Sequence, residues 1–267
     1  MSDDLKRELE TAREAARAAG KILLGYYGGG IKVREKSVDN PVTAADLEAN
    51  ELLKAAILKA FPDDGWLSEE TADSADRLAK KRVWIVDPLD GTKEFINEIP
   101  EFCVCIALVE DGMPRVAVEY NPARDELFHA SRGGGAFLND GPIHVSAQTD
   151  LRHARVLASR SEEARGEWDA YQPLMKVELT GSVAYKFALV ASGRHDATFT
   201  LTPKNEWDVC AGTLLVSEAG GMVTEPAGRA FRFNNRSTLL EEGLVASNGV
   251  LHRAILNTIK QTRAALE

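Results

Sequence analysis

Two aspartates stand at the end of an apolar stretch in the first half of the chain. Residues Val83–Val86 are β-branched or aromatic, as in a buried strand, and Asp87 and Asp90 follow closely. Pro88 has no N–H group to donate to a sheet, so the strand is predicted to end there. Both carboxylates would then lie together at a strand end, where a metal ion or a substrate can reach them.

Gly91 and Thr92 follow the second aspartate. Glycine permits close approach of the backbone, and a helix or turn that begins near Thr92 would point unpaired N–H groups at an anion such as phosphate. The stretch therefore predicts a site at which a metal ion and a phosphate meet. Asp-Pro and Asp-Gly are also common turn dipeptides, so two ordinary turns would explain the same residues.

Three further acidic residues follow or open predicted elements: Asp46, Glu69 and Asp208. Each has a structural explanation, because Thr43 and Asp46 match a capping box, Glu69 suits a solvated loop, and an acid in a helix's first turn complements its dipole. Together with the two aspartates, they would also supply the oxygen ligands that Mg²⁺ prefers. No histidine or cysteine is needed for such a site.

The composition limits the class of protein that must position these residues. The chain has 267 residues, 44% of them hydrophobic and 27% charged, which is typical of a globular protein with one or two α/β units. Its net charge of −9 argues against a nucleic-acid polymer as partner. No export leader and no membrane span is indicated, so the cytoplasm is the expected location. The cysteines, which lack disulfide or zinc spacing, are interpreted as small buried residues: Cys103, Cys105 and Cys210.

The hydrophobic periodicity predicts helices at both ends of the chain and strands between them. Helices are predicted over residues 4–27, 43–60, 161–169, 183–193, 207–219 and 250–266. Strands are predicted over 66–68, 83–86, 102–109, 116–120, 126–130, 135–138, 155–158, 197–201 and 244–246, and a charged loop over 73–82. Sequential antiparallel hairpins are expected in the middle section, with a second α/β half after it.

Four segments resemble, in order, the signature segments of the inositol monophosphatase superfamily: Asn40–Asp46, Ser68–Glu70, Trp84–Thr92 and Trp207–Gly212. The resemblance spans most of the chain, and the DPLDGT and WDVCAG elements are its specific parts. It implies a layered αβαβα sandwich with mostly antiparallel sheets, in one catalytic domain whose α/β halves cover about residues 1–150 and 151–267. It also implies Mg²⁺-dependent hydrolysis of phosphate monoesters, often with inhibition by lithium.

The resemblance implies a role for each candidate residue. Two or three Mg²⁺ ions would be held by four side chains and one backbone carbonyl: Glu69, Asp87, the carbonyl of Leu89, Asp90 and Asp208. Asp90 would bridge two ions, and Asp46 would lie beside the nucleophilic water or a third ion. The Thr92 hydroxyl, paired with Asp46 or Glu69, would orient and deprotonate that water, while amides near Gly91 and Thr92 hold the phosphate.

Within the superfamily, the sequence is most similar to the bacterial 3'(2'),5'-bisphosphate nucleotidases, through Lys93–Phe95, Pro203–Asp208, Gly181-Ser182 and Lys186-Phe187. Ser182 and Lys186 are therefore predicted to bind the substrate. Two positions depart from the known branches: Thr200 stands where the nucleotidases commonly carry an arginine, and Leu201 replaces a substrate-binding glutamate of the inositol branch. Lys186 is expected beside the buried stripe of its helix, where a solvent-exposed lysine is equally compatible.

These observations predict a cytoplasmic, Mg²⁺-dependent phosphomonoesterase, with adenosine 3',5'-bisphosphate as the first-choice substrate. Inositol monophosphate or another sugar phosphate is the alternative substrate. A regulator that binds a metabolite without turnover is the alternative class of protein. The expected partner is a small phosphate ester, with no membrane and no nucleic-acid polymer, and a homodimer is left open.

Overall fold

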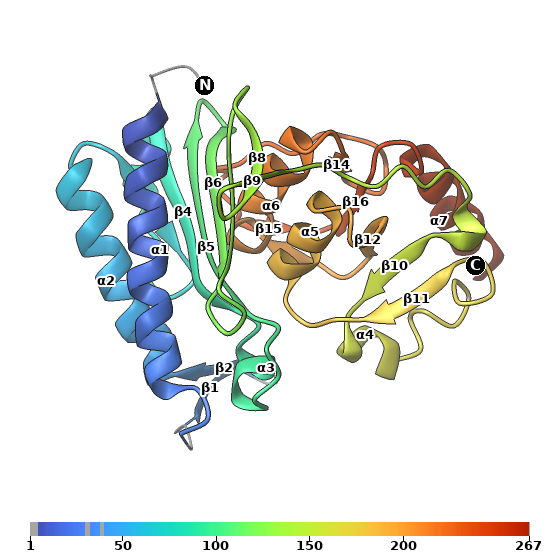
Figure 1. Cartoon of the computed structure of the whole chain (residues 1–267), viewed down its shortest axis with the longest axis horizontal. Helices are drawn as coiled ribbons and strands as arrows, with labels where there is room; N and C mark the ends of the chain where they lie inside the picture. Colours follow the sequence, from blue (N-terminus) through green and yellow to red (C-terminus); the bar gives the residue numbers. More distant parts are fainter. Residues whose placement is uncertain (1–4, 30–32, 38–39, 267) are drawn as a thin grey trace.

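The protein folds into five layers of alternating helices and sheets (Figure 1). The structure is a computed structural model and describes residues 5–29, 33–37 and 40–266. Two outer helices cover a seven-stranded sheet, two further helices separate that sheet from a five-stranded one, and a last helix closes the far side. The predicted αβαβα sandwich is therefore confirmed.

The larger sheet is a meander whose strands follow one another in sequence order. Its strands are β3 (Gly65–Ser68), β4 (Arg82–Asp90), β5 (Cys103–Glu110), β6 (Met113–Asn121), β7 (Glu126–Ser131), β8 (Gly135–Leu138) and β9 (Gly141–Ile143). Every neighbouring pair is antiparallel except β3 and β4, which run parallel. The predicted hairpins of the middle section are confirmed.

Two long helices, α1 (Lys6–Tyr26) and α2 (Ala44–Ala60), pack on one face of this sheet. Ala12, Ala16 and Ala19 form a fully buried stripe on α1, and their small side chains let it lie close to its neighbours. Both helices were predicted, although Asp4, the expected start of the first, lies outside the described residues. These helices cover the face of the sheet that carries Trp84, Val86 and Ile106.

The smaller sheet has the order β11-β10-β12-β16-β14 and is mixed. Its strands are β10 (Arg155–Ala158), β11 (Lys176–Leu179), β12 (Ala197–Thr200), β14 (Met222–Thr224) and β16 (Leu244–Ser247). Three helices pack against it: α5 (Val183–Ala191) and α6 (Glu206–Glu218) between the two sheets, and α7 (His252–Leu266) on the other face. Because α5 is enclosed by both sheets, every residue from Ala184 to Ala191 is buried.

Three local predictions are corrected by the structure. Strand β4 does not end at Pro88 but continues to Asp90 after an irregularity in its register. The helix expected over residues 161–169 is short, α4 (Arg160–Ala164), and turns follow it. The charged loop contains a 3₁₀ helix, Ala75–Ala79, because the Ser74 hydroxyl accepts a hydrogen bond from its first turn and caps it.

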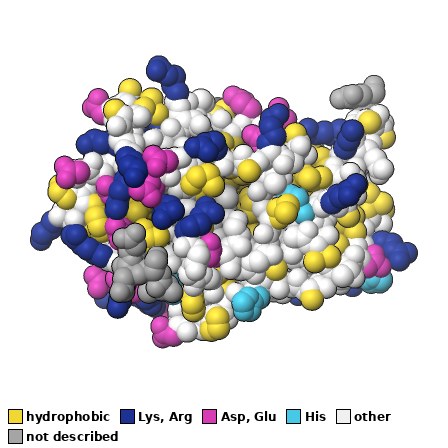
Figure 2. All heavy atoms as spheres, turned by 90° about the horizontal axis from the view of Figure 1, so that it is seen from above, with side chains coloured by type: hydrophobic (Ala, Val, Ile, Leu, Met, Phe, Trp, Pro, Cys, Tyr) yellow, Lys and Arg dark blue, Asp and Glu magenta, His cyan; other side chains and the backbone are white. Residues whose placement is uncertain are grey.

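The remaining elements are short. They are β1 (Val33–Ser37) and β2 (Asn40–Thr43), which form a two-stranded sheet, β13 (Lys204–Asn205) and β15 (Leu239–Leu240), which form another, α3 (Thr92–Ile96), and the 3₁₀ helix Leu151–His153. No helix in the described part of the chain is long and apolar enough to cross a membrane. On the face shown in Figure 2, basic and acidic side chains are interspersed.

Candidate active site

Three aspartates from two elements meet at one point. Asp87 and Asp90 lie at the end of β4, and Asp208 lies in the first turn of α6. One carboxylate oxygen from each lies within 4.8 Å of those of the other two. Asp87 pairs with Cys105 and Asp90 with Cys103, so Pro88 and Leu89 of β4 lie opposite a single residue of β5 in a bulge. Both carboxylates lie close to Asp208.

Burial and mutual repulsion disfavour the charged forms of these aspartates. Burial, then the neighbouring charges of Glu69, Asp90 and Asp208, raise the pKa of Asp87 well above its usual value. Burial and the charges of Asp90 and Glu69 do the same to the pKa of Asp208. Burial also raises the pKa of Asp90, against the lowering effect of hydrogen bonds from Ser182 and Ala184. A cation placed among these oxygens would remove the repulsion.

The donor set fits a hard divalent cation. Glu69 and Leu89 line the same cleft as the three aspartates, and the Glu69 N–H donates to the carbonyl of Val86 in β4. All side-chain donors at this point are carboxylate oxygens, which Mg²⁺ prefers over nitrogen or sulfur. The five residues predicted as metal ligands therefore lie in one place, and their role as ligands stays a prediction.

Thr92 and Asp46 are brought together from different helices. The Thr92 hydroxyl oxygen lies 3.3 Å from Asp46 Oδ1 and 3.1 Å from the carbonyl oxygen of Leu89. Asp46 also accepts from the backbone N–H of Thr43 at 2.8 Å, which confirms the capping box. The two explanations for Asp46 are compatible, because one carboxylate oxygen caps α2 while the other lies next to the Thr92 hydroxyl.

Gly91 makes the turn into the short helix α3. Its φ of 98° lies in the left-handed region that favours glycine, and an added Cβ would lie 2.8 Å from the carbonyl oxygen of Glu101. Gly91 and Thr92 both line the cleft beside the aspartates. The turn therefore places the predicted phosphate-binding amides next to the predicted metal site.

The cleft has a volume of about 350 Å³ and extends from the aspartates to residues of the C-terminal part. Several of its lining residues were not predicted as site residues from the sequence: Glu94, Ser159, Ser161, Glu162, Arg165, Thr202 and Lys204. Glu94 and Lys204 lie inside segments that carry the resemblance, and their charges were the signal available there. Glu162 lies in a stretch interpreted only as a charged helix, so nothing local indicated its position.

Lys186 is buried, so the solvent-exposed position that the sequence allowed for it is wrong. The residue is 5% exposed, because α5 lies between the two sheets and has no solvent-facing side. Burial lowers the pKa of Lys186, while the charges of Glu162, Asp90 and Glu94 raise it. Its ammonium lines the cleft, and within the described chain it makes no direct ion pair with these carboxylates.

Ser182 also lines the cleft, at the N-cap of α5. Its hydroxyl donates to Asp90 Oδ2 at 2.5 Å and accepts from the backbone N–H of Tyr185 at 2.9 Å. Gly181 precedes it, and an added Cβ there would overlap the side chain of Glu94. The segment is therefore packed tightly against the predicted metal site.

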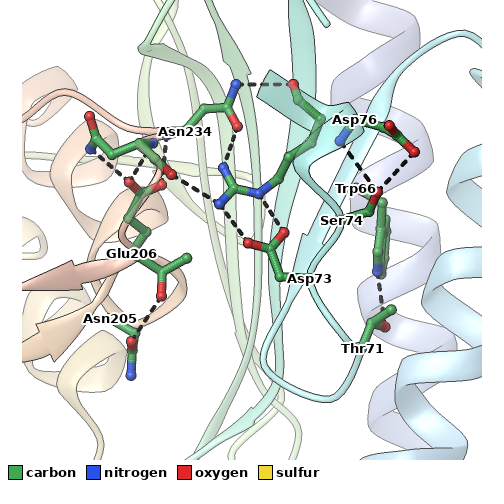
Figure 3. Close-up of polar contacts among 11 residues, drawn as sticks. Trp66, Thr71, Asp73, Ser74, Asp76, Asn205, Glu206 and Asn234 are labelled. Atoms are coloured by element: carbon green, nitrogen blue, oxygen red, sulfur yellow. Dashed lines mark hydrogen bonds and ion pairs between the residues drawn. The ribbon is translucent and has the colours of Figure 1, made fainter. Parts of the chain in front are cut away.

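A buried arginine, Arg77, connects the segment after β3 to the segment between β14 and β15 (Figure 3). Arg77 donates to both carboxylate oxygens of Asp73 at 2.7 and 2.8 Å, to Asn234 Oδ1 at 2.7 Å and to the carbonyl of Asn235 at 2.9 Å. The backbone N–H groups of Asn234 and Asn235 in turn donate to Glu206 at 2.6 and 2.8 Å.

This Arg77 network joins segments that carry predicted metal ligands. Asp73 lies four residues after Glu69, and Glu206 lies two residues before Asp208 in the first turn of α6. Glu206 is fully buried, so its three hydrogen bonds with Asn234 and Asn235 satisfy its carboxylate. The network therefore fixes the start of α6 relative to the segment after β3.

Comparison with known proteins places this arrangement in a family. Residues 4–264 match the family model described as "Inositol monophosphatase family". The chain is 36% identical to the inositol-1-monophosphatase of Mesorhizobium japonicum, over 94% of this chain and 96% of that protein. It is 34% identical to the histidinol-phosphatase of Chlorobaculum parvum, over the same shares of the two chains. Among solved structures, the Thermotoga maritima IMPase superposes with a TM-score of 0.87 at 29% identity, covering 98% of this chain and all of that one.

Proposed function

The chain belongs to the inositol monophosphatase family, and from that membership we propose that it is a Mg²⁺-dependent phosphatase whose substrate carries a second anionic group besides the phosphate that is removed. Members of this family are metal-dependent phosphoric monoester hydrolases that act on small phosphate esters. For this chain, our proposal concerns four points: which metal ion it uses, how many ions it binds, what each site residue does, and which ester is the substrate.

Mg²⁺ bound by the carboxylates would neutralise charge on the phosphate and make a bound water easier to deprotonate. The protein's own contribution would come from Thr92, which would orient that water. Its hydroxyl can donate its proton to Asp46 Oδ1, 3.3 Å away, which leaves an oxygen lone pair to accept a hydrogen bond from the water. The backbone around Gly91 would hold the phosphate that is transferred.

The buried ammonium of Lys186 is the observation that carries the choice of substrate. A desolvated cation is costly unless an anion compensates it, and the nearby carboxylates make no direct ion pair with it in the described chain. Lys204 adds a second cation to the same cleft. An anionic group of the substrate would compensate the charge of Lys186, whereas Lys204 already lies 3.7 Å from Glu162 Oε1.

Adenosine 3',5'-bisphosphate remains the first candidate, since its non-scissile phosphate would be the second anion. A phosphate monoester without that group is the second candidate, and the inositol-1-monophosphatase and histidinol-phosphatase among the relatives favour it. The cytoplasmic location, the lithium sensitivity, the homodimer and the division at about residue 150 stay predictions.

A substrate panel with and without Mg²⁺ tests the proposal. It compares kcat/KM for adenosine 3',5'-bisphosphate, AMP, inositol 1-phosphate and histidinol phosphate, because specificity is that ratio. We expect Mg²⁺-dependent phosphate release, fastest with the bisphosphate. Equal or faster hydrolysis of a monophosphate would overturn the second-anion assignment, and absence of release from every ester would favour the regulator instead.

A further inference from the structure

The side chain of Glu101 joins distant segments beside the candidate active site. Glu101 lies between α3 and β5, and its Oε2 accepts hydrogen bonds from Arg160 Nη1 at 2.6 Å and from the backbone N–H of Gly181 at 2.7 Å. Arg160 is the first residue of α4, and Gly181 comes two residues before α5. One carboxylate oxygen therefore ties the loop before β5 to the starts of two helices in the C-terminal part.

The loop that carries Glu101 is anchored on the larger sheet. The carbonyl of Pro100 accepts from Asn121 Nδ2 and from Arg124 Nε, both at 3.1 Å, and Asn121 is the last residue of β6. The Glu101 carbonyl oxygen lies against the predicted phosphate-binding turn, where a Cβ added to Gly91 would be 2.8 Å away. Glu101 therefore contacts this turn with its backbone while its side chain reaches the start of α5.

A strained residue follows Gly181. Ser182 has φ 58° and ψ 125°, a conformation that residues with a side chain rarely adopt and that persists only where surrounding contacts hold it. On one side, the Ser182 hydroxyl and the Ala184 N–H both donate to Asp90. On the other side, the Gly181 N–H donates to Glu101. The start of α5 is therefore held between two carboxylates, of which Asp90 belongs to the predicted metal site.

Glu101 is charged and lies outside the cleft. Burial acts to raise the pKa of Glu101, but the hydrogen bonds from Arg160 and Gly181 outweigh it, and the pKa is lowered from its usual value. A carboxylate accepts hydrogen bonds more strongly than a neutral group does. Within the described chain, neither Glu101 nor Arg160 lines the cleft, so Glu101 would act on the site through the residues that it holds.

We infer that Glu101 is a positioning residue of the metal site: by holding Gly181, it keeps Ser182 in its strained conformation. Ser182 thereby orients the Asp90 carboxylate towards a bound cation. This inference rests on the metal site of the proposed function and adds to it a residue that touches neither the metal ion nor the substrate. The other explanation is that the pair of Glu101 and Arg160 only stabilises the fold. The two explanations predict different effects on Mg²⁺ affinity.

Three variants separate these explanations. Glu101→Ala removes the carboxylate, whereas Glu101→Gln keeps an oxygen that can accept from Gly181 but removes the charge. Glu110→Ala is the matched control, because Glu110 lies at the opposite end of β5 and pairs with Lys81 at 3.2 Å and Arg115 at 3.4 Å. Denaturant unfolding without Mg²⁺ shows whether each variant folds and how much stability it loses.

Calorimetric titration of the full-length protein with Mg²⁺ is the deciding measurement, and it does not depend on hydrolysis of any ester. We expect Glu101→Ala to weaken Mg²⁺ binding about tenfold, the scale of one hydrogen bond to a charged group, and Glu101→Gln to retain most of the affinity. Glu110→Ala should leave Mg²⁺ affinity unchanged. If Glu101→Ala does not fold, Glu101→Asp, whose shorter side chain withdraws the oxygen from Gly181, replaces it with the same expectation.

A double-mutant cycle with Ser182→Gly tests the route through Ser182. Glycine adopts a positive φ without strain and has no hydroxyl, so Glu101→Ala should add little further loss of Mg²⁺ affinity in that background. A full tenfold loss there, an equal loss in Glu101→Gln and Glu101→Ala, or wild-type affinity in Glu101→Ala would each overturn the inference while leaving the phosphatase in place. If the wild type binds no Mg²⁺, the proposed metal site fails, and the inference fails with it.

Discussion

The hydroxyl of Ser182 donates a 2.5 Å hydrogen bond to the carboxylate of Asp90, a residue 92 positions earlier in the chain. The backbone N–H of Ala184 donates to the same oxygen at 2.7 Å. Ser182 has a φ of 58°, in the left-handed region, and this strained geometry starts α5 directly at the predicted metal site. The start of α5 therefore orients Asp90, and it leaves the other carboxylate oxygen for a metal ion.

Asp90→Asn should nearly abolish phosphatase activity and leave the fold intact, because the amide keeps the shape of the side chain but removes its charge. Calorimetric titration with Mg²⁺ and a phosphate-release assay measure the two effects. Asp111→Asn, in an exposed turn at φ 51°, where asparagine is tolerated, is the control. Wild-type Mg²⁺ affinity and turnover in Asp90→Asn would refute the metal-site assignment.

Thr92→Ala should lower kcat with little change in Mg²⁺ affinity, because its hydroxyl faces Asp46 and is proposed to act on the water. A positioned proton acceptor contributes about 10²–10⁴-fold to a rate. Single-turnover kinetics at saturating Mg²⁺ measure the change, and Thr92→Ser, which keeps the hydroxyl, should retain most of the rate. An unchanged single-turnover rate in Thr92→Ala would remove Thr92 from the mechanism.

Lys186→Met should raise KM for adenosine 3',5'-bisphosphate about tenfold, the scale of one charge-assisted contact, and barely change hydrolysis of inositol 1-phosphate. Methionine fills the buried space on α5 but carries no charge. Lys176→Met, at an exposed position on β11, controls for the loss of one positive charge. Equal losses on both substrates would show that Lys186 does not select the second anion.

Arg77→Met should weaken Mg²⁺ binding without changing any residue of the cleft, because the Arg77 network fixes the start of α6 and hence Asp208. It should also lower the free energy of unfolding by about 2 kcal/mol, since buried partners lose their hydrogen bonds. Calorimetry and denaturant unfolding give the two values. Arg253→Met, at an exposed position on α7, should change neither. Unchanged Mg²⁺ affinity in Arg77→Met would show that the Arg77 network stabilises the fold but does not position Asp208 for metal binding.

His252 should make the protein less stable in mild acid. The side chain is 3% exposed and lies 2.9 Å from the hydroxyls of both Thr224 and Ser247, and burial lowers its pKa from 6.5 to about 4. Between these values the unfolded chain binds one more proton, so this contribution is present above pH 6.5 and is lost as pH falls towards 4. Denaturant unfolding at pH 7, 5.5 and 4 measures the slope, which should be shallower in His252→Asn. Parallel slopes would contradict the assignment.

Local patterns predicted most of the elements. The apolar runs between Phe102 and Leu138, separated by turn residues, gave the hairpins, and the three cysteines are buried as interpreted. Strand-end carboxylates followed by glycine also pointed to the place where Asp87 and Asp90 now lie. These features depend on residues that are near one another in sequence.

Features that depend on distant residues could not be predicted in this way. The burial of Lys186 follows from a second sheet that covers α5, and no spacing within the helix indicates it. Pro88 was expected to end β4, but it lies in a bulge, and the register with β5 resumes at Asp90. Arg77 and Asn234 are 157 residues apart, so no local signal links them.

Arg77 and its partner Asn234 are 157 residues apart in the chain, so the parts of the site form at different times during synthesis. The seven-stranded sheet uses residues up to Ile143, so it can form while the rest of the chain is still being made. Asp208 and the asparagines at 234 and 235 emerge later, so Asp87 and Asp90 lack their third carboxylate, and Arg77 lacks its partners, until then. A chain truncated after the first sheet would keep the DPLDGT element but would lack Asp208, one of the predicted metal ligands.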